Sequence, residues 1–131
     1  MSKQCLDVQQ MQHLQELGLE LDYDTLCWYV KFEDTDWLLK PSSDLNIIGI
    51  SCRYIPAYTL QDVLDALPTS IRHNDCTYYL GMAKRGIAYE LYSEHGMVQA
   101  IQFGRRTLID AAYELLVWAI EQGYVETNKN E

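Results

Sequence analysis

Positive charge is scarce in this sequence. Lysine and arginine together number 10, against 19 aspartates and glutamates, and the formal net charge at pH 7 is −9. Proteins that bind nucleic acids or anionic membranes without specificity neutralise phosphates with Lys and Arg. The composition therefore argues against direct nucleic-acid binding and against a role at the membrane, and it favours basic protein partners.

Long apolar runs are also missing. No segment approaches the roughly 20 consecutive apolar residues that a membrane-spanning helix needs, and the opening MSKQCLDVQQMQHL holds no apolar signal-peptide core. The sequence predicts a cytoplasmic protein. In that reducing compartment the four cysteines Cys5, Cys27, Cys52 and Cys76 are expected to be free thiols that pack as small buried hydrophobes.

Enzyme and metal motifs are absent as well. The sequence has no Gly-rich phosphate loop, no G-x-S-x-G, no H-E-x-x-H and no C-x-x-C. The nearest approach to a metal site is His73 with Cys76, with Cys52 as a distant third ligand, and no fourth donor for zinc is evident. We therefore expect no metal, no cofactor and no catalytic residue, and we interpret His73 as a loop residue and Cys76 as a buried strand residue.

Three helices are predicted from apolar residues at helical spacing and from residues that suit helix ends. They cover residues 9–17, 59–67 and 107–122. Their expected ends are the N-caps Thr59 and Thr107, the stop at Pro68 and the left-handed glycines Gly18 and Gly123.

Strands are predicted where β-branched and aromatic residues lie between turn signals. They form a hairpin over residues 25–40 and a meander over residues 77–103, whereas residues 41–56 are expected to be a loop with one short strand. Alternation places Ile87, Tyr89 and Leu91 on one face of the central strand and Ala88, Glu90 and Tyr92 on the other. The chain 1–131 is therefore predicted to be a single α+β domain, in which the hairpin extends the antiparallel meander and two to three helices pack mainly on one face.

Acidic residues fall on one side of the last predicted helix. At about 100° per residue, Asp110, Glu114 and Glu121 lie within roughly 40° of one another. They predict one solvent-exposed acidic stripe, and apart from Gln122 the rest of the helix surface is apolar or aromatic.

The flanks of this helix carry more apolar surface than one sheet face can bury. Tyr113 and Val117 lie on one flank and Trp118 on the other. We therefore expect Tyr113, Val117 and Trp118 to meet the N-terminal helix or to form an interface with a protein partner or a second copy of the chain. On this basis Trp118→Ala should lower stability or dimerisation by on the order of 3 kcal/mol, and Asp110→Ala should cost far less.

Two adjacent arginines precede the same helix. Arg105 and Arg106, together with the backbone N–H groups that begin at Thr107, could hold a phosphate or a carboxylate. The alternative is that both guanidinium groups are solvated, and we favour it because no Gly-rich loop accompanies them. Arg105, Arg106 and Thr107 are nevertheless the candidate anion site of this sequence.

Several phrases of the sequence resemble one group of proteins. IPAYTLQDVLDALPTSI, TYYLGMA, LIDAAYELLVWAIEQGYVETNK and, nearer the start, MQHLQELGLELDYDTLCWYVK look like small uncharacterised proteins of gut bacteria and of their prophages and other mobile elements. The likeness covers most of the chain. It implies a small α+β domain and a mobile-element setting, and it assigns no catalytic or binding residue.

Three functions are left open by the sequence. The first is a non-catalytic interaction or accessory protein of a phage or mobile element, which can be a homodimer. The second is an acidic anti-defence or regulatory protein that occupies the basic site of a nucleic-acid-binding partner. The third is a small hydrolase or transferase, which needs a cysteine and a base such as His13, His73 or His95 brought together by the fold.

Overall fold

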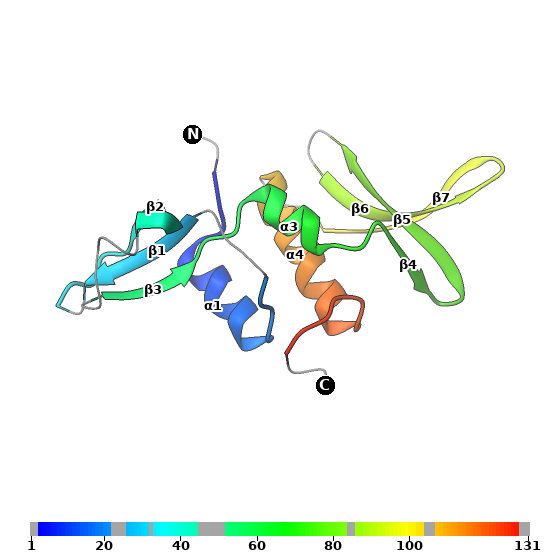
Figure 1. The fold of residues 1–131 in the computed structure, drawn as a ribbon. Helices are drawn as coiled ribbons and strands as arrows, with labels where there is room; N and C mark the ends of the chain where they lie inside the picture. Colours follow the sequence, from blue (N-terminus) through cyan, green and yellow to red (C-terminus); the bar gives the residue numbers. More distant parts are fainter. Residues whose placement is uncertain are drawn as a thin grey trace.

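Helices and strands follow one another in mixed order along the chain (Figure 1). The computed structural model describes residues 3–21, 26–31, 33–44, 52–83, 86–103 and 107–128. The elements are α1 (Val8–Glu16), β1 (Leu26–Lys31), β2 (Leu38–Pro41), the 3-10 helix η1 (Ser42–Asp44), β3 (Cys52–Pro56), α3 (Leu60–Ala66), β4 (Ser70–His73), β5 (Cys76–Ala83), β6 (Gly86–Ser93), β7 (Gly96–Gln102) and α4 (Leu108–Glu121). The predicted α+β class is confirmed.

The strands of the described residues form two separate antiparallel sheets, one at either side of the helices (Figure 1). One has the strand order β2-β1-β3 and the other the order β4-β5-β6-β7. The prediction that the N-terminal hairpin extends the meander is therefore wrong. β3 occupies the second edge of β1, and β4 occupies the second edge of β5. The N-terminal hairpin and the meander therefore belong to different sheets.

The hairpin of β4 and β5 was not predicted from the sequence. β4 and β5 are joined by Asn74 and Asp75, which both have left-handed backbones with φ of 51° and 64°. Two consecutive residues with positive φ make the tight turn that fits the twist of paired strands, and Asn and Asp tolerate this conformation best after Gly. His73 thus belongs to a strand, and its interpretation as a loop residue is wrong.

The predicted helix ends are confirmed. Thr59 Oγ1 accepts a hydrogen bond from the backbone N–H of Asp62, and Thr107 Oγ1 accepts one from Asp110, both at 3.2 Å. Gly18, which follows α1, has the left-handed φ of 89° that ends a helix. Among the helices of the described residues, none combines the length and the apolar character needed to cross a membrane.

α4 is enclosed by the N-terminal segment, by α3 and by β6. α3 and β6 pack against it, and Lys3 and His13 contact it from the N-terminal segment. Its buried residues are Ile109, Ala111, Ala112, Tyr113, Leu115, Leu116, Ala119 and Ile120. The apolar surface that one sheet face cannot bury is thus covered largely within the chain itself.

The four-stranded sheet has one covered face and one open face. Ile87 and Tyr89 on β6 are buried, on the side where α4 packs. Tyr92, on the other face of the same strand, is 54% exposed. The predicted alternation along this strand is confirmed, and α4 packs on the predicted face of this sheet.

Candidate functional site

The three residues of the predicted interface lie against different parts of the chain. Tyr113 is buried, and its hydroxyl lies 2.6 Å from Nδ1 of His13 on α1. Val117 and Trp118 are half-buried, and the Trp118 ring lies 5.3 Å from the ring of His73 on β4. One flank of α4 therefore meets the N-terminal helix, as expected. An interface of Tyr113, Val117 and Trp118 with another chain stays a prediction.

The Tyr113 hydroxyl contributes to holding α1 on α4. Burial, together with the negative charge of Glu114 and Asp7, raises the pKa of Tyr113 to about 12, so the hydroxyl keeps its proton at neutral pH. We expect Tyr113→Phe to lower the free energy of unfolding by about 1 kcal/mol, the usual net value of one hydrogen bond. Urea unfolding measures the change, with Tyr54→Phe on exposed β3 as the control. Equal stability of the two variants would show that the His13 contact is not stabilising.

Asp110 does not belong to a solvent-exposed stripe. Its Oδ1 accepts hydrogen bonds from Lys3 Nζ at 2.7 Å and from Gln10 Nε2 at 3.0 Å, and its Oδ2 accepts one from Thr107 Oγ1 at 2.7 Å. The predicted exposure of Asp110 is therefore wrong, because the N-terminal segment packs over the first turn of α4. The expectation that Asp110→Ala is nearly harmless loses its basis.

Of the candidate anion site, only Thr107 lies among the described residues. Arg105 and Arg106 lie outside the described residues. Thr107 caps α4 and shares its hydroxyl with the Asp110 carboxylate. A carboxylate at this helix start already occupies the position that favours negative charge, and binding of an anion by Arg105, Arg106 and Thr107 stays a prediction.

His73 is the centre of an aromatic cluster. Its Nδ1 lies 2.7 Å from the hydroxyl of Tyr124, and its ring meets the rings of Tyr78, Trp118 and Tyr124 edge-on at 5.3 to 5.9 Å between centroids. Aromatic pairs in this geometry stabilise packing beyond the area that they bury. His73 thus connects β4 to α4 and to the segment after it.

Three cysteines have described side chains, and none of Cys5, Cys27 and Cys76 forms a disulfide. Cys76 pairs opposite His73 across the β4–β5 hairpin, and it is half-buried, so its interpretation as a buried strand residue is wrong. In the part of the chain that the structure describes, no three His, Cys, Asp or Glu residues are grouped so that they could hold a metal. His73 and Cys76 also line neither of the two hollows described below.

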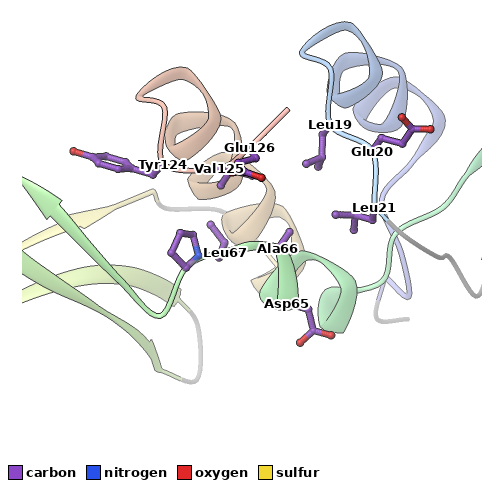
Figure 2. A pocket seen from close by; sticks show the side chains of 10 residues that line it. Leu19, Glu20, Leu21, Asp65, Ala66, Leu67, Tyr124, Val125 and Glu126 are labelled. Atoms are coloured by element: carbon purple, nitrogen blue, oxygen red, sulfur yellow. The ribbon is translucent and has the colours of Figure 1, made fainter. Parts of the chain in front are cut away.

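A hollow of about 400 Å³, lined by both polar and apolar groups, opens between three segments that are distant in the sequence (Figure 2). They are residues 19–21 after α1, residues 65–68 at the end of α3 and residues 124–126 after α4. Leu19, Leu67 and Val125 are buried beneath it, and Leu19 and Leu21 point toward the opposite wall (Figure 2). We call this feature the α3 groove.

The rim of the α3 groove is acidic. Glu20, Asp65 and Glu126 line it, one from each segment, and all three are exposed. Glu20 and Asp65 point away from the apolar floor (Figure 2). Among the described residues that line the groove, none is Lys, Arg or His. An apolar floor inside a ring of carboxylates can take up an apolar side chain with cationic groups beside it.

Hydrogen bonds from outside hold the groove walls in place. The backbone N–H of Asn128 donates to the carbonyl of Gly18 at 2.9 Å, which ties the last segment to the first. The Tyr89 hydroxyl donates to the carbonyl of Pro68 at 2.8 Å, which ties the middle segment to β6. Burial raises the pKa of Tyr89, so this hydroxyl remains a donor at neutral pH. The groove is therefore formed before any partner arrives.

A second hollow of about 450 Å³ lies on the open face of the four-stranded sheet. Glu90 stands in it and accepts a hydrogen bond from the Tyr92 hydroxyl at 3.0 Å, and this bond raises the pKa of Tyr92. Gly81 makes room for the carboxylate, since a Cβ there would collide with Glu90. Met97 borders the hollow and is 56% exposed. This face combines exposed apolar side chains with one carboxylate.

Sequence reasoning missed the α3 groove because its walls carry no local motif. Each segment contains apolar residues beside one carboxylate, a pattern that also describes an ordinary helix or loop boundary. Only the packing of α1, α3 and α4 brings the three segments together.

Comparison with known proteins adds no assignment to these surfaces. No family model, no curated protein and no solved structure matches this chain.

Proposed function

We propose that this chain is a non-catalytic interaction protein that binds a basic and apolar segment of a partner protein in the α3 groove. The observation that carries the proposal is the set of three exposed carboxylates, Glu20, Asp65 and Glu126, that line a hollow with Leu19, Leu67 and Val125 buried beneath it. Apolar side chains of the partner fill the floor, and neighbouring Lys or Arg groups reach the carboxylates at the rim.

The charges and the volume set the expected strength of this binding. A hollow of about 400 Å³ lies within the range of ligand sites but holds only a few side chains. Exposed ion pairs contribute up to about 1 kcal/mol each and weaken with salt. Binding is therefore expected to be modest and to fall as ionic strength rises, and the hydrogen-bonded walls keep the cost of ordering low.

The biological setting belongs to the same proposal. The resemblance to proteins of prophages and mobile elements supports an accessory role in such an element, in the cytoplasm. The alternative of an anti-defence or regulatory protein is favoured by the net charge of −9, which suits a partner's nucleic-acid-binding site. Because apolar side chains form the floor of the α3 groove, a peptide-like segment of a partner suits it better than a partner's flat phosphate-binding surface.

The test uses a short synthetic peptide with two leucines between lysines in a Gly/Ser background, and the same peptide with glutamates in place of lysines. Backbone amide chemical shifts of the full chain report where each peptide binds. We expect the lysine peptide to shift the amide signals of residues 19–21, 65–67 and 124–126, and the glutamate peptide to leave them unchanged. Binding at another surface, or no binding of the lysine peptide, contradicts the proposal.

A matched pair of triple variants tests the role of the rim. Glu20→Gln, Asp65→Asn and Glu126→Gln together should weaken lysine-peptide binding about tenfold, since three rim pairs at about 0.5 kcal/mol sum to roughly 1.5 kcal/mol. The control makes the same charge change at carboxylates that are exposed elsewhere, Glu33→Gln, Asp36→Asn and Glu94→Gln. An equal loss in both triple variants would reduce the effect to net charge and exclude the groove.

A further inference from the structure

Among the strands that the structure describes, four lie at sheet edges, namely β2, β3, β4 and β7. An edge strand presents unpaired backbone N–H and C=O groups, which invite pairing with another chain. Proteins suppress such pairing by short edge strands and by charged residues and prolines on them. The four edges of this chain differ in these features.

Three of the edges are protected. β2 contains Lys40 and Pro41, β3 contains Arg53 and Pro56, and β4 contains Arg72, and none of the three exceeds five residues. β7 is seven residues long, and its sequence GMVQAIQ has no charged residue and no proline. In a chain with 29 charged residues among 131, an uncharged edge strand of this length is an exception that calls for a partner.

The outer edge of β7 is open. All residues of the strand are exposed or half-exposed, and Met97 and Val98 are 56% and 62% exposed. Among the described residues, no backbone hydrogen bond joins β7 to a segment other than its neighbour β6. A bulge interrupts the pairing with β6 near Met97, but from Gln99 to Gln102 the register is regular. This part presents an intact strand edge.

We propose that β7 of one copy pairs antiparallel with β7 of a second copy, about a two-fold axis at Ala100, and joins the two four-stranded sheets into one. A two-fold axis perpendicular to the sheet keeps the face of every side chain, so Gln99 lies opposite Ile101 of the second copy. This inference is independent of the α3 groove and goes beyond the proposed function.

The lack of charged residues on β7 allows a second acidic copy of the chain to pair at this edge. Each chain carries a net charge of −9, yet a β7–β7 contact brings no like charges face to face because the strand has none. Repulsion between the remaining charges is screened beyond about 8 Å at physiological ionic strength. Val98, which is 62% exposed and lies two residues from Ala100, is at the end of this contact.

The expected dimer is reversible and is strengthened by salt. A contact limited to one strand edge buries less than about 1,200 Å², the range of weak and transient interfaces. Added salt screens the repulsion between two acidic chains and raises the dimer fraction. This is the opposite of the salt dependence expected for peptide binding in the α3 groove, so the two proposals can fail separately.

Sedimentation equilibrium of the full chain over a series of concentrations, at low and high salt, tests the dimer. Gln99→Lys places two ammonium groups close to the axis and should weaken dimerisation at least about tenfold. Ser70→Lys on the exposed edge strand β4 makes the same change in net charge and should leave dimerisation unchanged. Wild-type protein that stays monomeric at all concentrations, or equal dimerisation of the two variants, overturns the proposal.

Hydrogen exchange on wild-type protein tests the pairing of β7 with a second copy even if Gln99→Lys fails to fold. Amides of β7 that point away from β6 should exchange at least about tenfold more slowly at high protein concentration, because they donate to the second copy. Amides of β4 should exchange at the same rate at every concentration. If exchange in β7 does not depend on concentration, the strand does not pair with a second copy.

Discussion

Trp118→Ala is expected to lower the free energy of unfolding by about 3 kcal/mol, the lower end of the range for truncating a large aromatic in a core. The Trp118 ring packs with His73 at 5.3 Å, Tyr124 at 5.7 Å and Tyr89 at 6.3 Å between centroids. These contacts join α4 to both β4 and β6, so the truncation leaves a cavity where three elements meet. We therefore expect the truncation to lower the stability of the fold, and the dependence on protein concentration tests the alternative of an interface.

Urea unfolding at two protein concentrations measures the effect of Trp118→Ala. The control is Tyr79→Ala, which removes an aromatic side chain that is 55% exposed on the open face of the sheet and should cost less than about 1 kcal/mol. A loss that grows at the lower protein concentration would assign Trp118 to an interface between chains. If Trp118→Ala is as mild as Tyr79→Ala, the aromatic cluster does not support the core.

Asp110→Asn should cost about 2 kcal/mol at neutral pH. Partial burial raises the pKa of Asp110, but hydrogen bonds from Lys3, Gln10 and Thr107 and the Lys3 charge outweigh it and lower the pKa from 3.8 to about 2. A carboxyl whose pKa is lower in the folded state stabilises the fold above its unfolded pKa. That contribution is lost as pH falls from about 4 through about 2.

The pH dependence of unfolding isolates this contribution. Wild-type protein and Asp110→Asn should differ by about 2 kcal/mol at pH 7. The difference should shrink as pH falls from about 4 through about 2, because the folded state keeps Asp110 ionised down to its pKa of about 2 and both states are protonated only below it. Glu121→Gln, on the exposed end of the same helix, should change stability by only a few tenths of a kcal/mol. A difference between wild type and Asp110→Asn that does not change with pH would rule out the ion pair as its source.

Asp110 and Glu121 show what a helical period can and cannot reveal. Periodicity placed Asp110, Glu114 and Glu121 together on one side of α4. The structure leaves Glu121 exposed but covers Asp110 with Lys3 and Gln10. A period states which residues share a side, but it carries no information about a segment that is about 100 residues away along the chain and packs there.

The strands show the same division. The meander of β5, β6 and β7 was predicted because alternating residues and turn signals lie next to one another in the sequence. β4 was missed since it is four residues long and contributes a single buried residue, Ile71, to the core. Its existence depends on pairing with β5 and on the left-handed turn at Asn74 and Asp75.

The candidate surfaces depended on tertiary structure to different degrees. The uncharged composition of β7 can be read from the sequence, but its position at an edge follows only from the strand order. The α3 groove could not be anticipated, because Glu20, Asp65 and Glu126 come from three distant segments.

The α+β class, the ends of the helices and the meander can be predicted from the amino-acid sequence alone. These features depend on residues within a few positions of each other, such as Thr59 and Asp62 at the start of α3. Tertiary packing is needed to see that the described strands form two sheets, that Asp110 is paired and that a groove forms beside α3. The physical reason is that burial and charge pairing are set by which distant segments pack together, and many packings satisfy the same local pattern of apolar and polar residues.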